Sequence, residues 1–317
     1  MSVSGFRRVW GGGPSAGALG GRTVKSCVAA PVFALVFLWG ATSYAETLCV
    51  EGPGGTHGCA YTLPSVAVAA AVANDVIVIY PGTYQEPATI NVTKALKIAG
   101  IDPRNTIVTN AVAANVFTVS TGNVPVEISG LTITGGLTGI QGSGSTSLTV
   151  HHNLIVFNGQ HGIFLFNGPT SLIQHNVVYG NGFNGIVGGD VFDSNIVANN
   201  GNVGISATGA IANYNAVFGN TNNNSASGTG NIFVDCLFVG PYYVLEDSSP
   251  CKDAGNPSPG LLDVDGSRSD MGVYGGPRAA AFWPYGSGGP VITDLTVDPV
   301  IVPRGGTLSI NATGEIR

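Results

Sequence analysis

Three aspartates in the middle of the chain have the residue type and spacing that glycoside hydrolysis would need. Asp190 and Asp193 lie three residues apart in "GGDVFDSN", and Asp235 follows further along. Of two carboxylates beside a glycosidic bond, one can act as general acid and the other as general base. Aspartates are equally common in solvated turns, so this pattern alone does not define a site. Asp190, Asp193 and Asp235 are the catalytic candidates if the protein is an enzyme.

Aromatic and histidine side chains form a second group of candidates. Phe157 and Tyr179 follow equivalent asparagines in a repeat and are expected to face outward, where aromatic rings can bind neutral sugars. Packing inside the fold is the alternative. His152 and His175 share one repeat position, but no cysteine or carboxylate nearby completes a metal site there. We therefore take Phe157, Tyr179, His152 and His175 as ligand-binding candidates.

A short acidic loop near the end of the chain offers oxygen ligands. In "DVDGSRSD", Asp263, Asp265 and Asp270 surround a glycine. Carboxylates at alternating positions suit Ca²⁺, although the terminal glutamate of an EF-hand loop is missing. Calcium is the one metal that this sequence suggests, and no other cofactor is expected.

The candidates of the first two groups lie in or beside a repeat of about twenty residues. Two copies read "HNLIVFNGQHGI" and "HNVVYGNGFNGI", and four copies align on one asparagine. An apolar residue stands three positions before that asparagine and another two positions after it, and a second asparagine follows five positions after it. The aligned asparagines are Asn153, Asn176, Asn195 and Asn215, and the second set is Asn158, Asn181, Asn200 and Asn220.

Such a period, with short β-type runs and no helical spacing, predicts a solenoid of stacked coils. Equivalent residues of successive coils then form columns. An asparagine in each turn can donate to and accept from the asparagine of the next coil, and asparagine also tolerates the left-handed backbone of tight turns. The sequence therefore assigns the repeated asparagines a structural role.

The chain resembles right-handed parallel β-helices of the pectin-lyase-like type. The resemblance rests on the asparagine repeat, on "VIVIYPGTY" and "LKIAG" before it, and on "SPCKDAGNPSPGLLDVDGSRSDMGVYGGP" after it. It implies an all-β fold with three strands per coil over 46–277. It further implies a short helix over 65–74 that covers the first coil, and a final segment that closes the C-terminal end.

The resemblance does not carry a known active site onto this sequence. Lyases of this type use Arg or Lys as the base, and no Lys or Arg occurs from Asn105 to Cys251. The motifs of pectin methylesterases and the Gly-His-Gly and Arg-x-Lys motifs of polygalacturonases are also missing. Whether the protein is an enzyme stays open, and a non-catalytic role is favoured.

The ends of the chain indicate export. Residues 1–45 hold four basic and no acidic residues, an apolar run at 28–40 and a small-x-small site at Ser43–Ala45, which is typical of a secretory signal. Translation starting near Val24 would give such a signal a more usual length. Residues 278–289 are read as a linker. Residues 290–317 alternate like the first strands of an immunoglobulin-like module that the sequence does not complete.

The cysteines agree with an exported protein. Four remain after the signal, and their spacing favours the local disulfides Cys49–Cys59 and Cys236–Cys251, with free buried thiols as the alternative. A secreted or cell-surface location follows, and no later segment is apolar enough to span a membrane.

Charge restricts the partners. Beyond residue 45 the chain keeps 8 of its 12 basic residues and all 18 acidic residues, a net charge of −10. Nucleic acid and anionic lipid require cationic side chains, so both are excluded. The sequence thus predicts an exported, monomeric β-helix that binds a neutral polysaccharide or serves as an adhesive surface scaffold. A polysaccharide hydrolase or lyase with a divergent site is the alternative.

Overall fold

The computed structural model describes most of the chain beyond the predicted signal. The described residues are 45–122, 124–144, 147–166, 171–223 and 226–284, with the backbone of 290–298 and 309–316. The predicted signal lies outside them except for residue 45, and so do residues 285–289 of the predicted linker. Among the described residues, no helix has both the length and the apolar character that crossing a membrane would require.

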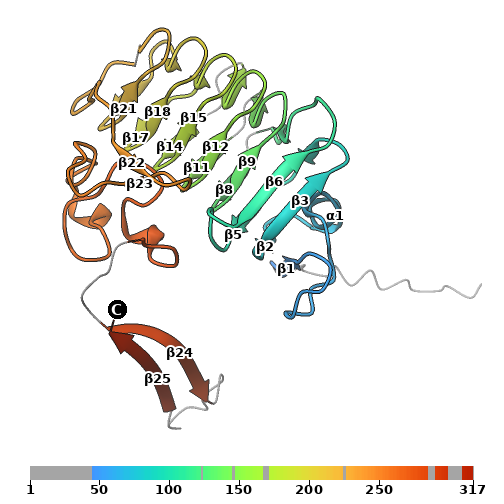
Figure 1. Cartoon of the computed structure of the whole chain (residues 1–317). Helices are drawn as coiled ribbons and strands as arrows, with labels where there is room; N and C mark the ends of the chain where they lie inside the picture. The colour runs from blue at the N-terminus through green and yellow to red at the C-terminus, as the bar shows by residue number, and fades with distance from the viewer. Residues whose placement is uncertain are drawn as a thin grey trace, which may run out of the picture. The chain divides into compact units, whose positions relative to one another are not determined.

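Three parallel sheets form a β-solenoid of about six turns, because each coil contributes one strand to each sheet (Figure 1). The fold is therefore mostly β, as the sequence predicts. Sheet A contains β1 (Thr47–Val50), β2 (Val76–Ile79), β5 (Leu96–Gly100), β8 (Pro125–Ser129), β11 (Ser147–His151), β14 (Ser171–Gln174), β17 (Val191–Asp193) and β20 (Ile211–Asn213). Sheet B contains β3 (Gly82–Glu86), β6 (Thr106–Asn110), β9 (Thr132–Thr134), β12 (Leu154–Val156), β15 (Val177–Tyr179), β18 (Ile196–Ala198) and β21 (Ala216–Phe218). Sheet C contains β4 (Ile90–Val92), β7 (Phe117–Val119), β10 (Ile140–Ser143), β13 (Ile163–Phe166), β16 (Ile186–Val187) and β19 (Ile205–Ser206).

The core contains a column of buried apolar side chains from each of the three sheets. Strands alternate inward and outward residues, and the parallel register places each inward residue beside its equivalent in the next coil. The repeat alignment made from the sequence gives this same register. The fully buried columns are Ile98, Ile128, Val150, Ile173, Phe192 and Ala212 in sheet A, Ile133, Ile155, Val178, Val197 and Val217 in sheet B, and Ile140, Ile163, Ile186 and Ile205 in sheet C.

Two buried asparagine ladders hold the turns together, and the predicted ladder is confirmed. The Nδ2 of each ladder asparagine donates to the Oδ1 of the next: Asn153 to Asn176 at 3.1 Å, Asn176 to Asn195 at 3.0 Å and Asn195 to Asn215 at 2.9 Å. The same Oδ1 atoms also accept the backbone N–H groups of the preceding asparagines. A second ladder with the same pattern joins Asn158, Asn181, Asn200 and Asn220.

The left-handed backbone of these turns lies one residue before each ladder asparagine. In the first ladder His152, His175, Ser194 and Tyr214 have φ between 50 and 56°. The ladder positions therefore require asparagine for its side-chain amide, which must both donate and accept hydrogen bonds. The repeat pattern predicted the left-handed conformation at the asparagine itself, whereas in the structure the preceding residue adopts it.

At the N-terminal end, a disulfide and a helix adjoin the first coil. Cys49 and Cys59 are bonded as predicted. Helix α1 spans Pro64–Ala70, shorter than the predicted 65–74, and its Ala67 and Val68 are buried in the solenoid core. Proline at its first turn suits a helix start, because the missing N–H needs no partner there.

The chain beyond β21 folds back along the solenoid. Residues 232–284, here called the C-terminal segment, include β22 (Phe238–Val239), β23 (Val244–Leu245) and the 3₁₀ turns Pro259–Leu261 and Pro277–Ala279. Its buried residues form one apolar cluster with the outward side chains of β12, β15, β18 and β21. The predicted Cys236–Cys251 disulfide is present and fully buried in that cluster. The segment therefore covers the outer face of sheet B, which differs from the expected closure of the solenoid end.

Beyond the C-terminal segment, the described backbone forms an antiparallel pair. Strand β24 (Pro290–Asp298) pairs with β25 (Ser309–Ile316), with an irregularity between Ile292 and Asp294.

Candidate functional site

An aromatic hollow opens where the C-terminal segment meets sheet B. Its lining is Phe157, Tyr179, Phe238, Gly240, Pro241 and Tyr243, and its volume is about 340 Å³. Phe157 follows β12 and Tyr179 ends β15, so the repeat supplies one wall. The hairpin of β22 and β23 supplies the other. We call this feature the aromatic hollow.

The rings of the aromatic hollow contact one another at edge-to-face and tilted angles. Tyr179 is central: its ring centroid lies 5.9 Å from Phe157 and 5.0 Å from Tyr243. The Phe238 ring lies 5.2 Å from Tyr243 and perpendicular to it. Phe157 is 59% exposed and the other three aromatic residues are half-buried. One ring therefore stands open beside three that are held in place.

The backbone around Phe157 leaves space for its ring. Phe157 has a φ of 53°, a left-handed conformation that turns the chain out of β12. In the next coil Gly180 occupies the equivalent position, and a Cβ there would lie 2.6 Å from the Phe157 ring. Only glycine leaves room for the ring at this point.

The lining of the aromatic hollow is uncharged. Burial, with a smaller effect of Tyr179, raises the pKa of Tyr243 above its usual range, so its hydroxyl keeps its proton. No residue of the lining is acidic or basic. A surface of this kind fits the apolar faces of uncharged sugar rings, with tyrosine hydroxyls as the polar contacts.

His152 and His175 lie apart from the aromatic hollow, beneath the C-terminal segment. Both are almost fully buried, and their rings lie 5.1 Å apart. The Nε2 of His152 donates to the backbone oxygen of Gly275 at 2.8 Å. Burial lowers the pKa of His175 to about 3 and that of His152 well below its usual value. Both rings are neutral and line a small cavity of about 160 Å³ away from the aromatic hollow.

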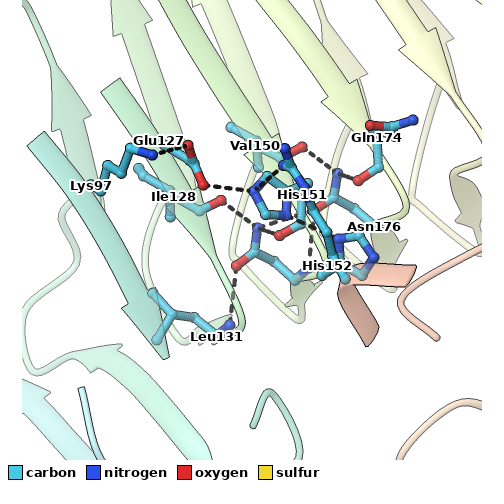
Figure 2. A network of polar contacts seen from close by, with 11 residues as sticks. Lys97, Glu127, Ile128, Leu131, Val150, His151, His152, Gln174 and Asn176 are labelled. Carbon is cyan, nitrogen blue, oxygen red and sulfur yellow. Dashed lines mark hydrogen bonds and ion pairs between the residues drawn. The ribbon is translucent and has the colours of Figure 1, made fainter. Parts of the chain in front are cut away.

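A polar network continues from His152 along sheet A (Figure 2). The Nδ1 atoms of His151 and His152 are 2.9 Å apart, and His151 Nε2 lies 3.1 Å from Glu127 Oε1. Lys97 Nζ lies 3.6 Å from the other oxygen of Glu127, and Arg278 from the C-terminal segment reaches His151 at 3.0 Å. The hydrogen bond with His151, aided by nearby positive charge, lowers the pKa of Glu127 to about 2.

The three catalytic candidates have separate partners. Asp190 lies just before β17 and accepts a hydrogen bond from the backbone N–H of Ser171 at 2.9 Å. Asp193 is the last residue of β17, and it accepts hydrogen bonds from Asn256 at 2.7 Å and from Ser194 at 2.9 Å. Burial raises the pKa of Asp193. Asp235 is exposed and accepts from the N–H of Leu237 within its own turn. No hydrogen bond in the described residues links one of these carboxylates to another.

The acidic loop of the C-terminal segment contains a compact group of carboxylates. Asp263 and Asp270 are buried, and burial raises the pKa of each to about 7. Asp253 joins them, with one oxygen of each residue within 4.8 Å of the others. Asp265 lies outside this trio, is exposed, and accepts from Ser267. The sequence pattern predicted Asp265 as the third carboxylate, whereas in the structure that place is taken by Asp253, ten residues before Asp263.

The sequence pattern also did not identify the other two aromatic residues that line the aromatic hollow. Phe238 and Tyr243 lie outside the repeat, so no register placed them. The one available signal was the aromatic run "FVGPYY" between Cys236 and Cys251, because a local disulfide would fold that run back on itself.

Comparison with known proteins gives structural likeness alone. No protein-family model matches the chain, and none of the curated proteins does. Among solved structures, the chain is similar to pectin methylesterase PemA from Erwinia chrysanthemi, at a TM-score of 0.38 and 15% identity over 56% of each chain. It is also similar to a mutant pectin methylesterase in complex with hexasaccharide IV, at a TM-score of 0.38 and 16% identity over 60% of this chain and 61% of that chain.

A third similar structure is pectate lyase Pel9A, at a TM-score of 0.37 and 14% identity, with 73% of this chain and 96% of that chain covered. The chain spans only somewhat more than half the length of the two pectin methylesterases. The parallel solenoid itself is established by the three-sheet strand register of this chain, as the sequence predicts.

Proposed function

We propose that this protein is an exported, non-catalytic β-helix that binds neutral polysaccharide through the aromatic hollow, as a monomer or as part of an adhesive surface scaffold. The observation that carries the proposal is the convergence of Phe157, Tyr179, Phe238 and Tyr243 around one open hollow. Aromatic rings pack against the C–H faces of sugars, and convergent concave surfaces bind ligands better than isolated rings.

Charge supports a neutral ligand. The residues of the aromatic hollow all come from the stretch between Asn105 and Cys251, which contains no lysine or arginine. A uronate or sulfated polymer would therefore meet no cationic side chain in the lining of the aromatic hollow. Binding of a neutral chain displaces few counterions, so its affinity should depend little on salt.

The architecture supports export and display. Two disulfides are favoured in oxidising compartments, and the signal-like residues 1–45 would direct the chain there. We further propose that the coils wind right-handed, as parallel crossover connections almost always do. Helix α1 acts as the N-terminal cap, and β24 and β25 begin an immunoglobulin-like module.

A glycan array probed at low and at high salt tests this function. We expect weak binding to neutral oligosaccharides that is nearly the same at both salt concentrations. Strong, salt-sensitive binding to polygalacturonate or alginate would contradict the proposed ligand class. Shortening of a neutral polymer by the purified protein would contradict the non-catalytic role.

A further inference from the structure

The carboxylates of Asp253, Asp263 and Asp270 are arranged as ligands for one cation. One oxygen from each lies within 4.8 Å of the other two, a spacing that a single ion at usual calcium–oxygen distances could bridge. Asp263 and Asp270 are 5% and 1% exposed, whereas Asp253 is exposed. Two of the three ligands are therefore fixed inside the fold and the third lies at the surface.

Backbone contacts hold the two buried carboxylates in place. Asp263 Oδ2 accepts the N–H of Asp270 at 2.9 Å, and its Oδ1 accepts the N–H of Gly276. Asp270 Oδ1 accepts the N–H of Asp253 at 2.8 Å. Each of these oxygens keeps a lone pair for a further partner.

The Oδ2 atom of Asp270 is available to bind a cation. It is buried and has no hydrogen-bond partner among the described residues, although every other oxygen of the two buried carboxylates has one. A buried carboxylate oxygen left without a partner is costly. A bound cation would supply that partner.

The surrounding hollow has the charge that a divalent cation needs. Asp247, Asp263, Asp265 and Asp270 line it together with Lys252, Ser267 and Trp283. Four carboxylates therefore face one ammonium group, and Lys252 Nζ lies 2.9 Å from Asp247 Oδ1. Hard oxygen donors from carboxylates and a serine hydroxyl suit Ca²⁺, which accepts six to eight of them with flexible geometry.

We propose that Asp253, Asp263 and Asp270 form a Ca²⁺ site that ties the C-terminal segment together. Asp253 follows Cys251 closely, and Asp270 precedes the Gly275 and Gly276 backbone that covers His152 and His175. A cation here would join the disulfide region to the stretch that lies over sheet A and sheet B. The site is independent of the aromatic hollow and of the proposed glycan binding.

Terbium luminescence and thermal unfolding test the site on the whole exported chain. Trp283 lines the hollow and is the only tryptophan after residue 45, so it should sensitise Tb³⁺ bound there. After treatment with a chelator, we expect Tb³⁺ emission on tryptophan excitation, displacement of Tb³⁺ by Ca²⁺ more readily than by Mg²⁺, and a Tm raised by several degrees in millimolar Ca²⁺.

Three variants complete the test. Asp270→Asn and Asp253→Asn should lose the Tb³⁺ signal and the Ca²⁺-dependent rise in Tm. Glu246→Gln is the matched control, because its carboxylate is exposed in the same C-terminal segment but does not line the hollow, so it should respond like wild type. If Asp270→Asn does not fold, Asp253→Asn decides, since its carboxylate is exposed. Wild type without a Ca²⁺ response, or an Asp253→Asn variant with an unchanged response, would overturn the proposal.

Discussion

Replacing Asn176 by alanine is expected to lower the free energy of unfolding by about 3 kcal/mol or more, because several buried groups lose their partners at once. The Asn176 amide nitrogen donates to the backbone oxygens of Val150 and Gln174 at 2.8 and 2.9 Å, and to Asn195. Its oxygen accepts two hydrogen bonds from Asn153. Alanine leaves these groups buried and unpaired in the middle of the ladder.

Chemical denaturation of Asn176→Ala beside Asn91→Ala measures this effect. Asn91 is exposed in sheet C, and its side chain makes one hydrogen bond, to the oxygen of Thr89. Loss of this hydrogen bond in Asn91→Ala should change the free energy of unfolding by roughly 0.5 kcal/mol or less. Equal free energies of unfolding for the two variants would show that the ladder does not stabilise the coils.

Acidification is expected to destabilise the wild type relative to a His175→Asn variant, by roughly 3 kcal/mol between pH 7 and pH 4. In the unfolded chain His175 takes up a proton near pH 6.5, whereas in the folded chain its pKa is about 3. The unfolded state therefore binds more protons in this range, and the stability present above pH 6.5 falls as the pH falls. His152, whose pKa is also lowered by burial, acts in the same direction.

The comparison with the variant is needed because other groups titrate in the same range. Asp263 and Asp270 have raised pKa values of about 7, so in the absence of a cation they favour the folded state as the pH falls. Glu127, with its pKa near 2, loses its contribution only below about pH 4.5. Asparagine at position 175 removes the imidazole and tolerates the left-handed backbone, where φ is 50°.

Denaturation curves at pH 7, 5.5 and 4 give the free-energy difference between wild type and His175→Asn. The variant should gain stability steadily relative to the wild type as the pH falls. A difference that stays constant over this range would mean that His175 is not held neutral beneath Gly275 and Gly276.

The sequence predicted the solenoid well because its constraints are local and repeated. Columns such as Val150, Ile173 and Phe192 could be aligned by spacing alone, and any shift of register would have removed apolar residues from the core. Both asparagine ladders follow from the same alignment. The left-handed position was misplaced by one residue, because Ser194 and Tyr214 are not residue types that indicate such a turn.

The candidate site could be predicted only in part, because half of it comes from outside the repeat. Phe157 and Tyr179 were identifiable from their repeat positions. Phe238 and Tyr243 reach them only because the C-terminal segment packs on sheet B, which is a long-range apolar contact without a spacing rule. Long-range contacts of the C-terminal segment also bury His152. They likewise explain why Asp253, and not the predicted Asp265, belongs to the acidic trio.

Binding of neutral polysaccharide at the aromatic hollow is tested most directly by affinity electrophoresis of two alanine variants, in gels that contain the neutral polymer bound best by the wild type. Phe157 and Phe166 are both exposed phenylalanines, 59% and 53%, but only Phe157 lines the aromatic hollow, whereas Phe166 stacks on Phe164 in sheet C. We expect Phe157→Ala to weaken binding about tenfold or more and Phe166→Ala to leave it unchanged, since stacking on one ring contributes roughly 1 to 2 kcal/mol. Equal retardation of Phe157→Ala and wild type, or a loss of binding in Phe166→Ala alone, would contradict the assignment of the aromatic hollow as the binding site.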